Sequence, residues 1–177
     1  MKTRDLTMIA LFAALTAVGA WISIPIPPVP FTFQVFFVLL AGAVLGSVRG
    51  GLSQIVYVLL GAVGLPVFAG GASGPGVLVG PTGGYIFGFI AAAFLIGALC
   101  GDNPGYGRSL AAMVAGVIVI YALGLLQLMF VAKLGLVPAF IAGVAKFVPF
   151  DLVKAVMAAA LVQRLRPFLV AQTLTSI

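Results

Sequence analysis

Long apolar segments alternate with short stretches that are charged or rich in glycine and proline along the whole of this chain. The apolar runs are close to the length of about 20 residues that a helix needs to cross a bilayer, whereas strands of membrane barrels need only about 10. A helix also satisfies its own backbone hydrogen bonds inside lipid. The pattern predicts an all-α integral membrane protein whose single domain, residues 1–177, is a bundle of six transmembrane helices at residues 6–24, 33–48, 52–68, 85–99, 110–132 and 138–163.

Three connecting stretches have distinctive compositions. Residues 25–32 contain four prolines, which lack an amide donor and fix φ, so we expect a stiff extended connector. Residues 49–51, Arg-Gly-Gly, indicate a tight charged turn. Residues 69–84 are rich in glycine, which permits left-handed turns and leaves backbone amides accessible to a ligand. A flexible linker is the alternative there, but long loops inside compact domains are often functional, and we predict a lid.

Composition supports the membrane assignment and excludes other classes. Hydrophobic residues make up 63% of the chain and charged residues 7%, and the mean hydropathy is +1.32, so the outer surface has to face lipid. The net charge is +6, and the basic residues lie mainly between the apolar segments. They therefore indicate the orientation of the chain in the membrane and do not imply nucleic-acid binding. The absence of histidine excludes histidine-based proton relays and triads, and a single cysteine, Cys100, excludes an internal disulfide.

The distribution of basic residues predicts the orientation in the membrane. With six spans, the two termini lie on the same side, and that side carries most of the basic residues, whereas the other carries Lys133. Loops rich in Lys and Arg stay inside, so we expect a multi-pass protein of the cell membrane with both termini in the cytoplasm and the 69–84 lid outside. The basic residues on the inner side are Lys2, Arg4, Arg49, Arg108, Arg164 and Arg166.

The first apolar segment has two further interpretations. Its basic start would also suit a signal peptide, but five comparable segments follow, which favours a first transmembrane helix. Within it, four alanines recur at helical spacing and form a stripe of small side chains on one face, which lets another helix approach closely. That stripe either packs inside the domain or docks a separate membrane protein, and it consists of Ala10, Ala13, Ala14 and Ala17.

The last apolar segment contains two opposite charges, Asp151 and Lys154, on one helical face near the bilayer midplane. A lone charge there costs roughly 2.5–3.5 kcal/mol on insertion scales, so such residues persist when they pair, line a cavity or hold a ligand. One alternative is a structural ion pair between helices. The other is a buried polar site for a small molecule that carries hydrogen-bond donors and a negative charge. Pro149 can kink this helix beside the pair.

The residues favour ligand capture over chemistry. The sequence contains no nucleotide-binding motif, and neither a nucleophile–base pair nor a metal cluster is visible. We therefore expect no catalytic residue, metal or cofactor, and the interpretation as a membrane enzyme is not favoured. A carrier coupled to protons through Asp151 stays an alternative. Polar and aromatic residues at the outward ends of the segments complete the expected site, which comprises Asp151, Lys154, Tyr85, Thr82, Gln34, Phe31 and Tyr57, with Phe147 and Phe150 in its lining.

Several blocks of sequence resemble a known family. Residues 8–16 (MIALFAALT) resemble the alanine-rich first helix of S components of energy-coupling factor (ECF) transporters. Residues 28–34 (PVPFTFQ), 57–70 (YVLLGAVGLPVFAG), 80–85 (GPTGGY) and 149–154 (PFDLVK) are similar to the signature blocks of the biotin-specific BioY family, in the right order. One position departs from the expected pattern, since Phe150 stands where a small residue is expected, and this affects the packing beside Asp151.

The resemblance implies a high-affinity biotin-binding membrane subunit that joins a transmembrane coupling protein and two cytoplasmic ATPases, with the alanine stripe as the docking surface. It also implies that Asp151, Lys154 and residues 80–85 lie at the biotin site. Biotin offers two ureido N–H donors, an apolar middle and a carboxylate. We expect Asp151 to meet the ureido group and Lys154 the same polar cluster or the carboxylate, with Lys146 as a rival for the latter. An S component for another small vitamin is the nearest alternative.

Overall fold

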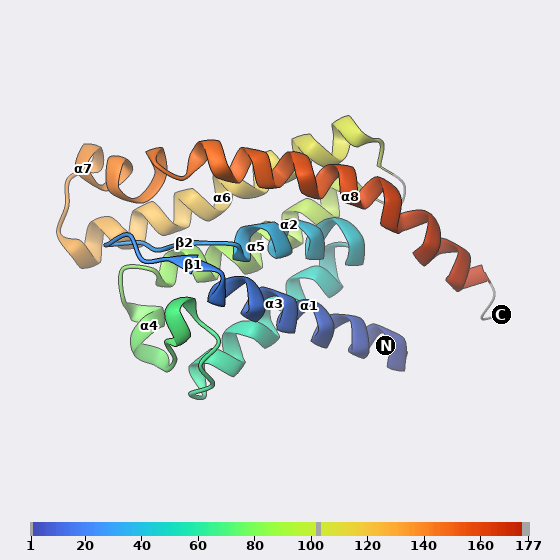
Figure 1. Ribbon diagram of the computed structural model, residues 1–177, viewed down its shortest axis with the longest axis horizontal. Helices are drawn as coiled ribbons and strands as arrows, with labels where there is room; N and C mark the ends of the chain where they lie inside the picture. Colours follow the sequence, from blue (N-terminus) through green and yellow to red (C-terminus); the bar gives the residue numbers. More distant parts are fainter. Residues whose placement is uncertain (1, 102–103, 175–177) are drawn as a thin grey trace.

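The structure, a computed structural model, describes residues 2–101 and 104–174, with side chains as far as residue 165. It is a bundle of helices with one short hairpin at one end (Figure 1). The elements in chain order are α1 (Thr3–Trp21), β1 (Ser23–Ile24), β2 (Phe31–Thr32), α2 (Gln34–Leu45), α3 (Ser47–Ala62), a 3₁₀ turn η1 (Ala69–Gly71), α4 (Pro75–Val79), α5 (Gly83–Cys100), α6 (Tyr106–Ala132), α7 (Leu136–Phe140), a π-helical turn η2 (Ile141–Ala145) and α8 (Val148–Leu174).

Helix α2 is the centre of the bundle. It contacts α1, α3, α5, α6 and α8, and 10 of its 12 residues are buried. A helix that is buried on every side has to be apolar on every side, which explains its unbroken hydrophobic sequence. Gly42 allows α5 to approach closely, because a Cβ there would lie 2.7 Å from the carbonyl oxygen of Ala93. Gly88 does the same for α5 against α6, with Ile120 Cα at 2.9 Å.

Helix lengths show which elements can cross a membrane alone. Among the described residues, three helices are long and apolar enough, namely α1, α5 and α6, and a fourth crossing exists if the bent pair of α7–η2 and α8 counts as one span. Helix α2, with 12 residues, is about 18 Å long, short of a hydrocarbon core of about 30 Å. The prediction of helices is confirmed, and the expectation of six spans is not tested by these lengths.

The turn between α2 and α3 is not where the sequence analysis placed it. Residues 49–51 lie inside α3, and the chain turns at Gly46, which has φ +81°. That backbone conformation is favourable only for glycine, so Gly46 sets the boundary between α2 and α3. The prediction of a turn at residues 49–51 was wrong. Helix α3 ends at Ala62, earlier than the predicted residue 68.

The two unusual connectors are both more ordered than expected. Residues 25–30 do not run straight on but fold back, because β1 pairs antiparallel with β2 in the register Ser23↔Thr32 and Ile24↔Phe31. The glycine-rich stretch contains η1, the short helix α4 and the first turn of α5. Proline at the start of α4, Pro75, suits the first helical turn, where no amide donor is needed. The predicted lid thus has internal structure of its own.

The last predicted span is broken. Helix α7 with η2 meets α8 at a bend of 40° around residues 146–147. Pro149 lies in the first turn of α8, and in a continuous helix its ring would collide with the carbonyl of Ala145, the residue at which η2 ends. The predicted kink beside Asp151 is confirmed, and it places the start of α8 one turn before that residue.

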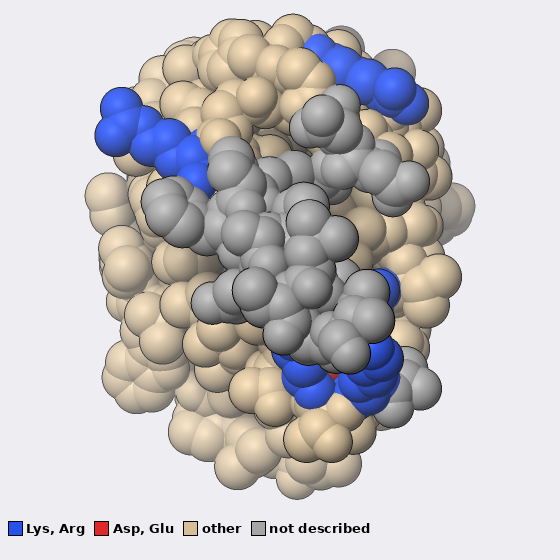
Figure 2. All heavy atoms as spheres, turned by 90° about the vertical axis from the view of Figure 1, so that its right-hand side faces the viewer, with Lys and Arg blue, Asp and Glu red and all other residues tan. Residues whose placement is uncertain are grey.

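The two ends of the bundle differ in charge. Helix α1 begins and α8 ends at the same end, and the connection from α6 to α7 lies at the opposite end (Figure 1). Figure 2 looks at the end with the two termini and shows Lys and Arg side chains around its rim. Arg49 there forms an ion pair with Asp5 at 3.1 Å. Lys2, Arg4, Arg49 and Arg108 lie at the starts of α1, α3 and α6, and Arg164 lies in the second half of α8. The side chain of Arg166 lies outside the described residues.

Candidate functional site

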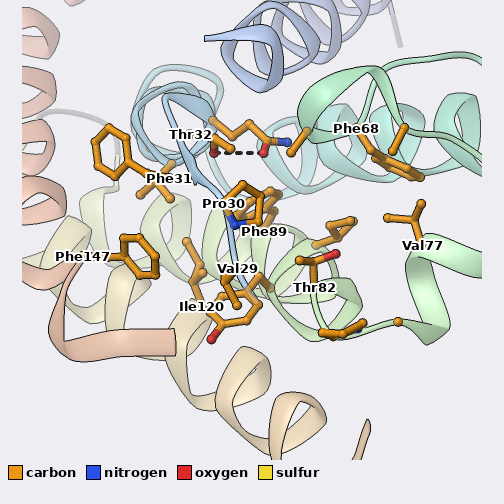
Figure 3. Close-up of a pocket in the computed structure, with 18 of the residues that line it drawn as sticks. Val29, Pro30, Phe31, Thr32, Phe68, Val77, Thr82, Phe89, Ile120 and Phe147 are labelled. Atoms are coloured by element: carbon orange, nitrogen blue, oxygen red, sulfur yellow. Dashed lines mark hydrogen bonds between the residues drawn. The ribbon is translucent and has the colours of Figure 1, made fainter. Parts of the chain in front are cut away.

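A cavity of about 390 Å³ lies between the hairpin, the lid segment and helices α5, α6 and α8. Phe31 and Phe147 lie on one side of it, and Phe68 and Val77 lie on the other (Figure 3). This volume falls in the range of about 300–1,000 Å³ typical of small-molecule sites. The remaining lining residues are Val29, Pro30, Thr32, Gln34, Val35, Ala69, Ala72, Gly76, Gly80, Pro81, Thr82, Tyr85, Ile86, Phe89, Ile120, Tyr121, Asp151 and Lys154.

The charged part of the cavity wall is an ion pair within α8. Lys154 Nζ lies 2.6 Å from Asp151 Oδ1, and the two residues are 4% and 3% exposed, so both charges are withdrawn from solvent. Tyr121 on α6 donates its hydroxyl to Asp151 Oδ2 at 2.6 Å. Each carboxylate oxygen therefore accepts one hydrogen bond from the protein. A carboxylate offers about four acceptor positions, so roughly two stay open to a ligand.

Lys154 also holds the hairpin in place. Its ammonium donates to the carbonyl oxygen of Thr32 at 2.6 Å and lies 4.1 Å from the centroid of the Phe31 ring. A cation within about 6 Å of an aromatic face is attracted by the ring quadrupole. The same side chain thus joins α8 to the segment that covers the cavity, and one of its three N–H donors has no hydrogen-bond acceptor among these contacts.

Gln34 is the first residue of α2, and its side chain is oriented by neighbours on both sides. Its side-chain oxygen accepts a hydrogen bond from the Thr32 hydroxyl at 3.0 Å, the dashed line in Figure 3. Its amide nitrogen donates to the hydroxyl of Tyr57, which in turn donates to the carbonyl of Val67 at 3.1 Å. This chain of bonds joins α2, α3 and the loop between α3 and η1 behind the cavity wall.

Tyr85 and Thr82 lie at the glycine-rich start of α5. Tyr85 donates its hydroxyl to the carbonyl of Gly143 at 3.0 Å. That carbonyl belongs to the π-helical turn η2, where the regular hydrogen-bond ladder is disturbed. Thr82 immediately precedes α5, and its side chain lies at the cavity in Figure 3. Both residues line the cavity, and Tyr85 connects it to the bend before α8.

The structure brings together six of the seven predicted site residues. Tyr57 is the exception, since it is fully buried behind Gln34 and does not line the cavity. Phe147 lines the cavity as expected. Phe150 does not, because it is 56% exposed on the outside of α8, where its ring packs edge-on against Phe31. Lys146 is exposed at the bend, 5.6 Å from the Phe147 ring and outside the lining. The residues that do line the cavity are Asp151, Lys154, Tyr85, Thr82, Gln34 and Phe31.

Sequence reasoning missed Tyr121, which contacts Asp151 directly. A tyrosine inside a long apolar helix looks like any other large side chain in a hydrophobic pattern. The available signal was Gly124, three positions later, because a small residue marks the face of α6 that is packed against α5, and Tyr121 lies on that face. Phe68, Phe89 and Ile120 were also missed for lack of a polar marker.

The alanine stripe is divided between core and surface. Ala13 is 1% exposed and packs inside the domain, so including it in a docking surface was wrong. Ala10 and Ala14 are exposed, and Ala17 is partly buried. The exposed face of α1 also carries Leu11 and Val18. A docking role is therefore restricted to the part of the stripe around Ala10 and Ala14.

The arrangement suits reversible binding of a small molecule that combines polar groups with an apolar body. Its polar groups are concentrated at Asp151, Lys154 and Tyr121, and most of the remaining wall is aliphatic or aromatic. Among the described residues, no group of three or more carboxylate, histidine or cysteine side chains could hold a metal ion. The site can accept and donate hydrogen bonds and compensate charge inside an apolar enclosure.

Comparison with known proteins gives concordant results. A model of the BioY family matches residues 1–171. The chain is 52% identical over 163 residues to a protein of Thermotoga maritima named biotin transporter BioY, covering 92% of this chain and 96% of that relative. It is 47% identical over 166 residues to a Pyrococcus horikoshii protein named probable biotin transporter BioY, covering 94% and 98%.

A solved structure is similar as well. The crystal structure of the S-component for biotin from an ECF-type ABC transporter has a TM-score of 0.87 to this chain and is 29% identical to it. The similarity covers 94% of this chain and 95% of that one. Both the sequence and the arrangement of helices are thus shared over nearly the full length of the relatives.

Proposed function

Because the chain belongs to the BioY family, we propose that the cavity described above is the place where this biotin uptake subunit holds biotin. The relatives with the matching sequences are named biotin transporters, and the similar solved structure is a transport component for biotin, which makes the chain a transport subunit and not an enzyme. The location of the ligand and the role of each residue are our proposal.

The observation that carries this proposal is the buried Asp151–Lys154 pair in the wall of an otherwise apolar cavity. Burying two charges costs several kcal/mol per ion before their attraction is counted, so a pair at a cavity wall calls for a further role. The open acceptor positions of Asp151 match the two ureido N–H donors of biotin. The aromatic and aliphatic wall matches its ring and chain.

Lys154 is the better candidate for the ligand's acceptor groups than Lys146. Lys154 lines the cavity and retains one donor after its bonds to Asp151 and Thr32. Lys146 is exposed and outside the lining. We assign Asp151 to the ureido group and Lys154 to the same polar cluster or the carboxylate, with Gln34, Thr82, Tyr85 and Phe31 completing the wall.

Replacing Asp151→Asn tests the proposal. The variant loses the charged acceptor and leaves Lys154 buried without its counter-charge, and hydrogen bonds to charged groups contribute about 1.5–3 kcal/mol each. The dissociation constant for biotin should therefore rise by about 10- to 100-fold, measured by isothermal titration with purified protein that still elutes as a single species.

Asp5→Asn is the matched control, because it also removes a carboxylate from an ion pair, with Arg49, but at the surface and away from the cavity. It should bind biotin like the unaltered protein. Unchanged affinity in Asp151→Asn would remove Asp151 from the site. Saturable binding of a different vitamin, with none of biotin, would point to an S component of other specificity.

The membrane arrangement belongs to the same proposal. We place the chain in the cell membrane with six membrane-embedded segments, both termini in the cytoplasm and the α4 segment outside as a lid. The basic residues at the end that carries the termini support this orientation (Figure 2). The central helix α2 reaches only part of the way across and is surrounded by longer helices.

The partners we propose are a transmembrane coupling protein and two cytoplasmic ATPases of an ECF module, which would supply the energy for import. The similarity to an S-component of an ECF-type ABC transporter supports such partners, and no resident cofactor is proposed. A proton-coupled carrier working through Asp151 is less favoured, because the similar solved structure is a component of an ECF-type ABC transporter.

A further inference from the structure

The lid segment is held against the bundle by few hydrogen bonds and by partial packing, since Ala72, Val77 and Leu78 are only partly buried against the core. Residues 72–82 include α4, which has no buried residue. In the described part of the chain, the hydrogen bonds that lead from this segment to more distant elements are one from Gly74 N–H to the carbonyl of Gly61 at 2.8 Å and two from Gln127. Its start is therefore bonded to α3. Its end continues into the first turn of α5 through backbone hydrogen bonds to Gly80 and Thr82, and the side-chain bonds that tie it to α6 come from Gln127.

Gln127 donates both hydrogens of its side-chain amide to backbone carbonyls of the lid segment. Its Nε2 donates to the carbonyl of Leu78 at 2.7 Å and to that of Gly80 at 2.7 Å. It is the one strongly polar side chain in the apolar part of α6, where lipid cannot compete for its hydrogen bonds, so the bonds are retained. The lid carbonyls gain a donor that their own short helix does not provide.

The first residues of α5 are shaped to admit this side chain. A Cβ on Gly83 would lie 2.5 Å from Gln127 Nε2, and a Cβ on Gly84 would lie 2.8 Å from Gln127 Cβ. A larger residue at Gly83 would also collide with the carbonyl of Leu78, and one at Gly84 with the carbonyl of Leu123, so either would displace the lid or α6 together with Gln127. The glycines that the sequence analysis attributed to backbone accessibility thus also make room for Gln127.

The residues that Gln127 holds are part of the cavity wall. Gly80 accepts one of its hydrogen bonds and lines the cavity, as do its neighbours Pro81 and Thr82 and, before Leu78, Val77. Gln127 itself is not a lining residue. Any effect of Gln127 on a ligand would therefore pass through these wall residues and would not need direct contact between Gln127 and the ligand.

We propose that Gln127 is a positioning residue that fastens the lid over the bound ligand and so sets how slowly the ligand leaves. This inference rests on the proposed biotin site. Removing the amide frees residues 78–82 to move away from α6, which opens the exit while leaving Asp151 and Lys154 unchanged. The effect falls on the dissociation rate.

The test compares Gln127→Met with Gln163→Met. Gln163 on α8 also donates from its side-chain amide to a loop carbonyl, that of Pro104 at 3.1 Å, but at the end of the bundle far from the lid. Gln127→Met should raise the biotin dissociation rate constant about tenfold, the value expected for two lost hydrogen bonds. Its association rate constant should stay within about twofold, and Gln163→Met should change neither rate.

Two further measurements distinguish positioning from general destabilisation. A nitroxide attached at Val79→Cys, which is 73% exposed on the lid, should become more mobile with Gln127→Met and not with Gln163→Met. Gln127→Glu keeps the size of the side chain but donates a hydrogen bond only when protonated. Its dissociation rate, relative to the unaltered protein at the same pH, should fall as the pH is lowered.

The outcomes separate this inference from the proposed function. If the unaltered protein does not bind biotin, the proposed function fails. If it binds biotin and Gln127→Met dissociates at the same rate, or if Gln163→Met shows the same acceleration, the assignment of Gln127 is overturned while the biotin site stands.

Discussion

At the scale of single residues, the site consists of polar groups that satisfy one another before any ligand is considered. Asp151 accepts from Lys154 and Tyr121, so its carboxylate plane is fixed between α6 and its own helix. A fixed acceptor binds a ligand better than a mobile one because less ordering is needed on binding. The hydroxyl of Tyr121 therefore contributes through Asp151.

Tyr121→Phe should weaken biotin binding by about 5- to 10-fold, less than the loss of about 10- to 100-fold expected for a direct hydrogen bond to a charged group, because Tyr121 acts by orienting Asp151. In the Asp151→Asn background the same change should add little, since the carboxylate that Tyr121 orients is gone. Titration calorimetry on the four proteins of this cycle gives the coupling.

The control for Tyr121 is Tyr57→Phe, which removes another buried hydroxyl that does not line the cavity. Its effect on affinity should be the same with Asp151 and with Asn at position 151. Full additivity of Tyr121→Phe and Asp151→Asn would show that Tyr121 does not act through the carboxylate.

The residues that could be predicted from sequence are those whose polarity conflicts with their surroundings. Asp151 and Lys154 were identified because charges among apolar residues are costly. Tyr57 was wrongly placed in the lining because the sequence does not say which face of α3 points to the cavity. Tyr121 was missed because an aromatic residue on an apolar helix carries no such conflict.

At the scale of elements, the sequence predicts that helices exist better than where they end. The central helix α2 and the start of α3 meet at Gly46, whose positive φ is a property of the folded backbone and not of the local pattern. The bend before α8 could be predicted, because Pro149 has one physical consequence wherever it falls in a helix. The hairpin of residues 23–32 could not be predicted, because its two strands have two residues each and are too short to show an alternating pattern.

Helix α1 presents an exposed face of small and apolar side chains around Ala10 and Ala14. If this face docks the coupling protein, Ala14→Trp should reduce co-purification with the ECF module and ATP-dependent biotin uptake by more than about tenfold, because a bulky ring prevents close helix approach. Pull-down and uptake in cells measure the two effects.

Binding of biotin to the isolated Ala14→Trp protein should be unchanged, since α1 contributes no lining residue. Ile118→Trp is the control, being 62% exposed on α6 and outside the proposed docking face. Normal uptake by Ala14→Trp would place the docking surface elsewhere.

At the scale of the whole molecule, charge and polarity divide the bundle into two ends. One end carries the termini and most of the basic residues, and the other carries the hairpin, the lid and Lys133 (Figures 1 and 2). The cavity lies towards the second end and is lined there by Phe31, Phe68 and Thr82. This polarity could be predicted from the positions of Lys and Arg, whereas the shape of the cavity depends on packing.

Two exposed glycines, one at each end, test the orientation. Gly135→Cys follows α6 and Gly107→Cys lies at its start. In intact cells, a membrane-impermeant maleimide should label Gly135→Cys and spare Gly107→Cys until the cells are opened. The native Cys100 is buried and should not react. Labelling of Gly107→Cys from outside would invert the topology.

The contact between Lys154 and Asp151 has an electrical consequence. Moving one elementary charge through the membrane potential involves work of about 2.3 kcal/mol per 100 mV. Two opposite charges that travel together contribute almost none of it. If the subunit tilts or rotates to deliver its cargo, the field across the membrane therefore does almost no work on this ion pair.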